Sequence, residues 1–285
     1  MTVLVTGTSG HLGRLTVLAL LDRGVPASEI VATARDLTAI ADLAERGVQT
    51  RRADYGDPAS LDAALAGVDR VLLVSSNAVG ARLEHHRNVI DAAARADVAL
   101  LAYTSVLRAD TSSLGLAADH LATEDALKQS GVPFTLLRNG WYTENYTENT
   151  AAALASGQVL GAAGEGRISA ATRRDFAEAA AVVLAEGEHA GAVYELAGDD
   201  AFTMAEYAAA LGAATGQEIA YTDLPAEEYA AALESAGVPA PFAQLLAGSD
   251  VGIAAGDLED RSGTLSRLIG RPTTPLADAL RDAGL

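Results

Sequence analysis

Short apolar or β-branched runs alternate with longer Ala- and Leu-rich stretches along the first half of this 285-residue chain. The short runs are typical of buried strands, and the stretches between them carry apolar residues at helical spacing. Such alternation favours βαβ units with a parallel sheet, because each helix carries the chain back across the sheet. We therefore predict a doubly wound α/β fold. The predicted strands are 2–5, 30–34, 48–51, 70–75, 99–103 and 134–137, and the predicted helices are 11–23, 37–46, 58–66, 80–95 and 119–130.

The rhythm loosens after Arg138. A Gly-rich stretch covers 157–166, a helix is predicted near 175–186, a strand at 193–196, and mostly short helices follow. No Pro- or Ser-rich linker separates two independent domains. We therefore predict two interleaved lobes, residues 1–138 and a smaller, mostly helical lobe 139–285, with segments near 174–198 packing back on the sheet.

Charge and composition exclude several functions. The chain has 38 acidic and 20 basic residues, for a net charge of −18, and no cysteine. Such a surface repels phosphate backbones, so we expect no nucleic-acid partner, and disulfides, thiolate metal sites and cysteine nucleophiles are excluded. The first apolar run, 2–5, is too short for a signal peptide or membrane span, and no later run reaches about 18 apolar residues. We expect a cytoplasmic protein.

A G-x-x-G-x-x-G run stands directly after the first predicted strand and opens the first helix. Its glycines allow a tight turn, a close approach of the backbone to a pyrophosphate and tight helix packing, while the helix N-terminus faces the phosphates. An ordinary Gly-rich turn is the alternative, but this context favours a Rossmann-like dinucleotide-binding domain in residues 1–138. The residues predicted to contact the cofactor here are Gly7, Thr8, Ser9, Gly10, His11, Leu12 and Gly13.

Arg35 lies at the end of the second predicted strand, 22 residues after Gly13. An arginine at this position can bind a ribose 2′-phosphate, which favours NADPH. Asp36 follows at once and could accept from a free 2′-hydroxyl, which leaves NADH possible. Either side chain could also be solvated.

Polar residues follow the next two strands. Asp54 is placed to accept from an adenine amino group, or else to cap the following helix. Ser75, Ser76 and Asn77 come after the fourth strand and would line the ribose of the cofactor. They support the site without identifying the chemistry.

The Tyr-x-x-x-Lys pair that many reductases of this superfamily use to pass a proton is missing. Lys128 is the only lysine, and Glu124 stands four residues before it. We predict that these two form an exposed i, i+4 ion pair, and that His120 either pairs with Glu124 or is solvated. No serine-hydrolase, zincin or P-loop motif occurs, and His85 with His86 diverge on one helix, so no metal site is expected.

The segment Arg138 to Tyr146 follows the sixth strand and holds the only tryptophan, two tyrosines and two asparagines. We interpret Trp141, Tyr142 and Asn145 as the wall of a slot for a flat apolar ring. The alternative is a hinge with Trp141 in the core.

These motifs give the chain a family likeness. It resembles the bacterial type 2 NAD(P)H:quinone oxidoreductases, which are NmrA-like atypical short-chain dehydrogenases, over nearly its whole length, and segment 138–146 makes the match specific. The resembling segments are 6–13, 25–32, 53–57, 86–90, 102–105, 136–146, 161–164, 171–175, 194–199 and 268–274.

The resemblance implies a two-lobed protein that binds NADPH and reduces a quinone. It places cofactor contacts on Gly7, Gly10, Gly13 and Arg35 and a site role on Asn145, although Asp36 departs from the neutral residue expected beside Arg35. Tyr103, Asn139 and Arg173 lie in matching segments and are added to the predicted cofactor contacts.

Our first hypothesis is a reductase in which NADPH gives a hydride to a small quinone. The Asn145 amide would donate a hydrogen bond to the developing oxyanion, with Trp141 and Tyr142 shaping the slot. The alternative is a non-catalytic NADP(H)-sensing regulator that acts through a protein partner. The sequence leaves open the physiological quinone, the oligomeric state and the use of a protein proton donor.

Overall fold

The computed structural model describes residues 1–78 and 80–285, which divide into two compact units. Unit 1 comprises Met1–Ala109, Ala118–Asn139 and Arg173–Glu195. Unit 2 comprises Asp110–Ala117, Gly140–Thr172 and Leu196–Leu285. Neither unit is continuous in sequence.

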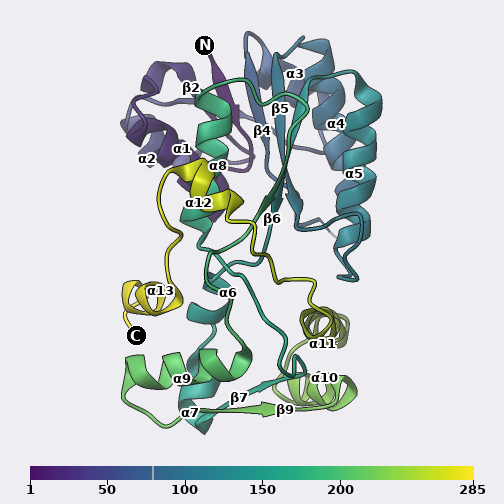
Figure 1. The fold of residues 1–285 in the computed structure, drawn as a ribbon. Helices are drawn as coiled ribbons and strands as arrows, with labels where there is room; N and C mark the ends of the chain where they lie inside the picture. The colour runs from purple at the N-terminus through teal and green to yellow at the C-terminus, as the bar shows by residue number, and fades with distance from the viewer. Residues whose placement is uncertain (79) are drawn as a thin grey trace. The chain divides into compact units, whose positions relative to one another are not determined.

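Unit 1 is built on a seven-stranded sheet of order β3-β2-β1-β4-β5-β6-β8 (Figure 1). Neighbouring strands from β3 through β6 pair in parallel, and β8 adds the strand beside β6. The strands are β1 (Val3–Val5), β2 (Ile30–Ala34), β3 (Gln49–Arg52), β4 (Arg70–Leu73), β5 (Leu100–Val106), β6 (Phe134–Asn139) and β8 (Val193–Leu196). The chain winds outward from β1 to β3 and then returns to β4 on the other side of β1. The expected doubly wound α/β fold is confirmed.

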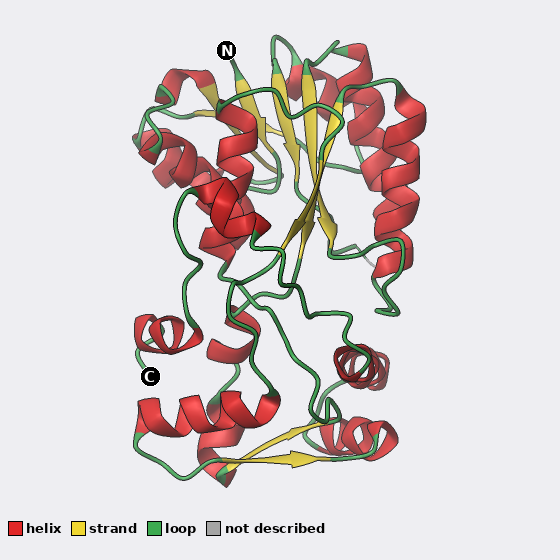
Figure 2. Cartoon of the chain, viewed as in Figure 1, coloured by secondary structure: helices red, strands yellow, loops and turns green. Residues whose placement is uncertain are grey.

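Helices cover both faces of this sheet (Figure 2). On one face α3 (Pro58–Leu65), α4 (Arg82–Arg95) and α5 (Ala117–Ser130) pack their apolar residues on the strands, as Leu61, Val89 and Leu127 show in the core with Leu101. On the other face α1 (His11–Asp22) packs against α8 (Arg173–Ala185). The short helices η1 (Ala27–Glu29), η2 (Leu37–Ile40) and α2 (Ala41–Glu45) flank β2.

Two strands run further than the sequence predicted. β5 continues to Val106 and β6 to Asn139, and the extra residues pair Ser105 with Arg138 and Val106 with Asn139. The polar residues of these extensions look like a loop in sequence, but parallel pairing satisfies their backbone groups. The extension fixes the backbone at the carboxyl ends of both strands.

Unit 2 is mostly helical, and strands β7 (Gln158–Gly161) and β9 (Ala220–Asp223) form a two-stranded parallel sheet. The sequence prediction missed both strands. The helices of unit 2 are α6 (Glu144–Thr147), α7 (Ala151–Ser156), α9 (Met204–Thr215), α10 (Ala226–Ser235), α11 (Ala240–Ala254), α12 (Thr264–Ile269) and α13 (Leu276–Asp282). An aromatic group anchors the core, with the Tyr146 ring centroid 5.2 Å from those of Phe202 and Tyr207.

Among residues 1–78 and 80–285, no helix has the length and apolar character needed to cross a membrane.

Candidate functional site

The turn between β1 and α1 has the geometry that the glycine motif predicts. Gly7 adopts a left-handed backbone with φ of 62°, and the Gly10 N–H donates to the Gly7 carbonyl at 3.0 Å. A Cβ on Gly13 would lie 2.6 Å from the Gly7 oxygen and 2.8 Å from the Thr6 oxygen, so only glycine lets the helix approach this closely. As in any α-helix, the first N–H groups of α1 have no partner within the helix and can receive an anion.

Two predicted contacts in this turn have a structural role. Thr8 donates to the Thr33 carbonyl through both its N–H (3.1 Å) and its hydroxyl (2.9 Å), so its donors are used in tying the turn to β2. The Leu12 side chain is buried in the core. By contrast Ser9, Gly10 and His11 are exposed at the tip. The cofactor contacts predicted for Thr8 and Leu12 stay predictions; the donors of Thr8 are engaged with β2, and the buried Leu12 side chain leaves its backbone as the part that could make such a contact.

Arg35 and Asp36, which follow β2, differ in their local contacts. Arg35 is exposed. Asp36 caps the short helix η2: its Oδ1 accepts from the Thr38 N–H at 2.9 Å and from the Thr38 hydroxyl at 2.7 Å. The hydroxyl bond and then the backbone bond lower the Asp36 pKa. Asp36, which in the sequence could have bound a ribose 2′-hydroxyl in place of Arg35, thus has a local capping role.

The loop after β3 places Tyr55 beneath the glycine turn. Its hydroxyl donates to the Val74 carbonyl at 2.8 Å and bonds the Thr6 hydroxyl, which links β1 to the end of β4. Asp54 accepts from the Gly56 N–H at 3.0 Å, while Asp57 caps α3. The alternative role of Asp54 as a helix cap is therefore wrong. The sequence analysis missed Tyr55, although its place in a resembling segment was a signal.

Side chains from α4 and β5 hold the loop that contains Ser75, Ser76 and Asn77. The Ser75 N–H donates to the Thr104 hydroxyl and the Ser76 N–H to His86 Nε2, both at 2.8 Å. His86 must therefore carry its proton on Nδ1, which faces the Thr123 hydroxyl at 2.9 Å. Burial lowers the His86 pKa to about 3. A neutral histidine, which the sequence analysis left without a role, thus fixes the predicted ribose loop.

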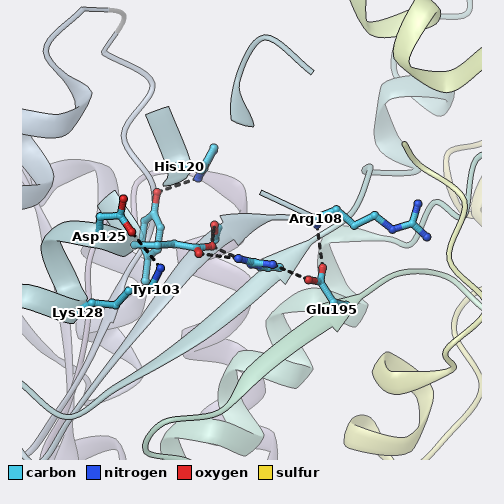
Figure 3. Close-up of polar contacts among 9 residues, drawn as sticks. Tyr103, Arg108, His120, Asp125, Lys128 and Glu195 are labelled. Carbon is cyan, nitrogen blue, oxygen red and sulfur yellow. Dashed lines mark hydrogen bonds and ion pairs between the residues drawn. The ribbon is translucent and has the colours of Figure 1, made fainter. Parts of the chain in front are cut away.

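The Tyr103 side chain lies in the core and is fully buried. Its hydroxyl is 2.8 Å from His120 Nδ1, as Figure 3 shows. Burial raises the Tyr103 pKa and lowers that of His120 to about 3. The cofactor contact predicted for Tyr103 stays a prediction, and His120 pairs with Tyr103 rather than with Glu124.

The predicted exposed pair of Glu124 and Lys128 is also wrong. Lys128 bonds Asp125 at 3.0 Å on the surface (Figure 3), whereas Glu124 is completely buried. Glu124 accepts from Arg138 through two bonds, from Nε at 2.9 Å and from Nη2 at 2.7 Å, and from the Ser105 hydroxyl at 2.6 Å. The i, i+4 spacing was a poor guide because that face of α5 packs on the sheet.

The network continues to β8. Arg138 Nη1 donates to Glu195 Oε1 at 2.8 Å, and Glu195 Oε2 accepts from the Arg108 N–H at 2.9 Å (Figure 3). Arg108 has a left-handed backbone with φ of 51°, which is uncommon for a residue other than glycine. The carboxyl ends of β5, β6 and β8 are thereby held together.

Asn139, the last residue of β6, is 5% exposed, and its Oδ1 is buried with no hydrogen-bond partner in the described chain.

In unit 2 the predicted substrate residues lie around α6. Tyr142 forms a bridge with Ala171, and the Ala171 N–H donates to the Trp141 carbonyl at 3.1 Å. Asn145 is half-buried on α6, and Trp141 packs against the core of unit 2. Arg173, the remaining predicted cofactor contact, is half-buried at the start of α8 in unit 1. Over the described residues, no three His, Asp or Glu side chains are grouped so as to hold a metal ion.

Known proteins match this chain over most of its length. The model of the NmrA-like family matches residues 1–264. The chain is 51% identical to Quinone oxidoreductase 2 of Escherichia coli (strain K12) over 98% of its own length and 97% of that protein.

Two solved structures are also similar. The crystal structure of an NADPH-dependent quinone oxidoreductase of Escherichia coli complexed with NADPH covers 100% of both chains, with 50% identity and a TM-score of 0.97. The Citrobacter sp. triphenylmethane reductase complexed with NADP(H) covers 99% of this chain and 100% of its own, with 37% identity and a TM-score of 0.94.

Proposed function

This chain belongs to the NmrA-like family, and we propose that it is an NADPH-dependent oxidoreductase that transfers a hydride from the nicotinamide to a quinone. The observation that carries the proposal is the 51% identity, over almost the full length of both chains, to a protein named Quinone oxidoreductase 2. The family resemblance drawn from the sequence motifs is thereby confirmed. Since the curated relatives include further oxidoreductases, such as an azoreductase, the matches favour an enzyme over a nucleotide-sensing regulator.

The residues of unit 1 fit a dinucleotide phosphate. The left-handed Gly7 and the contact that excludes a Cβ at Gly13 bring the backbone close to a pyrophosphate at the start of α1. Arg35 stands exposed beyond β2, where a 2′-phosphate would need a cation, and Asp36 is occupied in capping η2. We assign the pyrophosphate to the Gly7–Gly13 turn, the 2′-phosphate to Arg35 and the ribose to the loop Ser75–Asn77.

The missing Tyr-x-x-x-Lys pair suits a quinone. The only lysine is exposed and bonded to Asp125, so it cannot lower the pKa of a tyrosine at a site. Bound NADPH supplies the hydride, and the aromatic hydroquinone anion that results is stable enough to take its proton from water. We assign the Asn145 amide as the hydrogen-bond donor to the quinone oxygen, with Trp141 and Tyr142 as the walls that hold the ring. A cytoplasmic location and the lack of a nucleic-acid partner stay predictions.

The test is NADPH oxidation by the purified protein with a panel of small quinones, with NADH run in parallel. We expect quinone-dependent oxidation that prefers NADPH. A protein that binds NADPH tightly but oxidises it with no quinone would contradict the proposal and would favour the regulatory alternative.

A further inference from the structure

The side chain of Asn139 holds the one buried side-chain polar atom that has no hydrogen-bond partner among residues 1–78 and 80–285. The atom is Oδ1, and the residue as a whole is 5% exposed. Buried polar atoms are almost always paired, because an unpaired one has lost its water without replacement. An isolated buried acceptor at the end of a strand therefore points to a ligand that brings a donor.

The position of Asn139 in the sheet of unit 1 narrows the ligand. The strand order changes direction between β1 and β4, and a dinucleotide lies across this point, outside the carboxyl ends of the strands. Arg35 marks the β2 side, where the adenosine phosphate belongs. Asn139 ends β6, two strands beyond β4 on the other side, where the nicotinamide half belongs.

The backbone of Asn139 is held firmly. Its carbonyl accepts from the Leu107 N–H at 2.9 Å, and it pairs in register with Val106. The preceding residue, Arg138, is fixed by its two bonds to buried Glu124 and its bond to Glu195. The unpaired oxygen is therefore attached to one of the most constrained points of the sheet.

The chemistry of the atom then selects the partner. An amide oxygen only accepts hydrogen bonds, and so do phosphates and quinone carbonyls, so neither of these groups can satisfy it. Ribose hydroxyls can donate, but we have assigned the ribose to the loop Ser75–Asn77. The carboxamide of nicotinamide has an NH₂ group with two donors. Resting on the proposed function, we infer that Asn139 Oδ1 accepts a hydrogen bond from the nicotinamide carboxamide and so fixes the orientation of the ring that gives the hydride.

The test compares the binding of NADP⁺ with that of its 3-acetylpyridine analogue, in which a methyl ketone replaces the carboxamide and no donor remains. Titration calorimetry on the full chain gives both Kd values without any turnover. We expect the wild-type protein to bind NADP⁺ about ten- to hundredfold more tightly than the analogue, the loss expected when a buried acceptor is left unpaired. In Asn139→Leu and Asn139→Ala this ratio should fall to near one.

Asn88→Leu is the matched control. Asn88 is a half-buried asparagine of unit 1 whose amide donates to the Tyr55 carbonyl at 2.8 Å, so its loss should leave the ratio of the two Kd values as in the wild type. The ligand-free Asn139→Leu protein should also melt at or above the wild-type Tm, because the substitution removes an unpaired buried polar group.

Equal binding of NADP⁺ and the analogue by the wild-type protein would overturn the inference, whatever the variants do. A ratio that persists in both Asn139 variants would overturn it as well. A failure of the proposed function is measured separately, by quinone-dependent turnover. A protein that reduces quinones but binds NADP⁺ and the analogue equally would refute only the role of Asn139.

Discussion

Arg138 donates two parallel hydrogen bonds to Glu124, 2.9 Å from Nε to Oε1 and 2.7 Å from Nη2 to Oε2, and the Glu124 side chain is wholly buried. Removal of Glu124 takes both of these bonds from the buried Arg138 guanidinium, which keeps its bond to Glu195 at 2.8 Å. We expect Glu124→Ala to lower the free energy of unfolding by about 3–5 kcal/mol, measured by urea denaturation.

The surface pair one residue along α5 is the control for this prediction. Asp125 and Lys128 are about half exposed and lie 3.0 Å apart. Asp125→Ala should change the free energy of unfolding by about 1 kcal/mol or less. Similar losses for the two variants would show that Glu124 is not the buried centre of a network.

Gly13→Ala should damage the glycine turn. The added Cβ would lie 2.6 Å from the Gly7 oxygen, which is backbone and cannot move aside without opening the turn. We expect NADPH affinity to fall at least tenfold, with a loss of stability of about 1–3 kcal/mol from overpacking. Gly248→Ala on α11, where no atom lies within 4 Å of the new Cβ, should leave affinity unchanged. A Gly13→Ala protein with wild-type affinity would refute this account of the turn.

Arg35→Gln tests the choice of cofactor. Loss of a charged contact to a 2′-phosphate should raise the KM for NADPH about tenfold or more and leave the KM for NADH and both kcat values near wild type. Arg95→Gln, which affects an exposed arginine paired with Asp62, is the control and should change neither KM. If Arg35→Gln raises the KM for NADPH and the KM for NADH by the same factor, Arg35 does not bind the 2′-phosphate.

Asn145→Ala tests the proposed oxyanion contact. A donor that acts on developing charge affects turnover more than cofactor binding, so kcat should fall at least tenfold while the Kd for NADPH stays near wild type. Asn149→Ala is the control, because Asn149 is exposed and its side chain donates to the Asn145 backbone oxygen at 3.4 Å. Unchanged turnover in Asn145→Ala would remove this residue from the mechanism.

His120 gives a prediction about pH. Its pKa is lowered to about 3 by burial, so between about pH 6.5 and 3 the unfolded chain binds a proton here that the folded chain does not. The free energy of unfolding therefore rises with pH in this range, by up to about 1.4 kcal/mol per pH unit for this group, and levels off above pH 6.5. In His120→Asn, which can still accept from Tyr103, urea denaturation should show a slope smaller by nearly one proton at about pH 5, and this difference should shrink toward zero by about pH 7. An identical slope would mean that His120 is protonated in the folded state.

The alternation of apolar runs was enough to predict the sheet of unit 1, because parallel strands buried on both faces show as short continuous runs. It could not predict how far β5 and β6 extend, since Ser105, Arg138 and Asn139 are polar residues whose pairing is tertiary. β7 and β9 were missed for a related reason: each has four residues and only the other as partner, and β7 lies in a Gly-rich stretch.

The site was only partly predictable. The glycine turn follows from local backbone geometry, so spacing sufficed for Gly7 and Gly13. Glu124 and His120 were misassigned because helical spacing identifies neighbours on a helix and says nothing of which face the sheet will cover. The unpaired oxygen of Asn139 can be recognised only once every other polar atom around it has its partner.

The order in which the chain emerges from the ribosome matters for unit 1. β6 ends at Asn139, but its outer neighbour β8 is not complete until Leu196, and α8, which covers α1, lies in the same late segment. A nascent chain therefore displays an unpaired strand edge and a bare helix face for more than fifty residues of synthesis, while segment Gly140–Thr172 of unit 2 is being made. Fragments that stop at the end of β6 should consequently aggregate, and shortened forms of unit 1 need residues 173–195 supplied in the same chain.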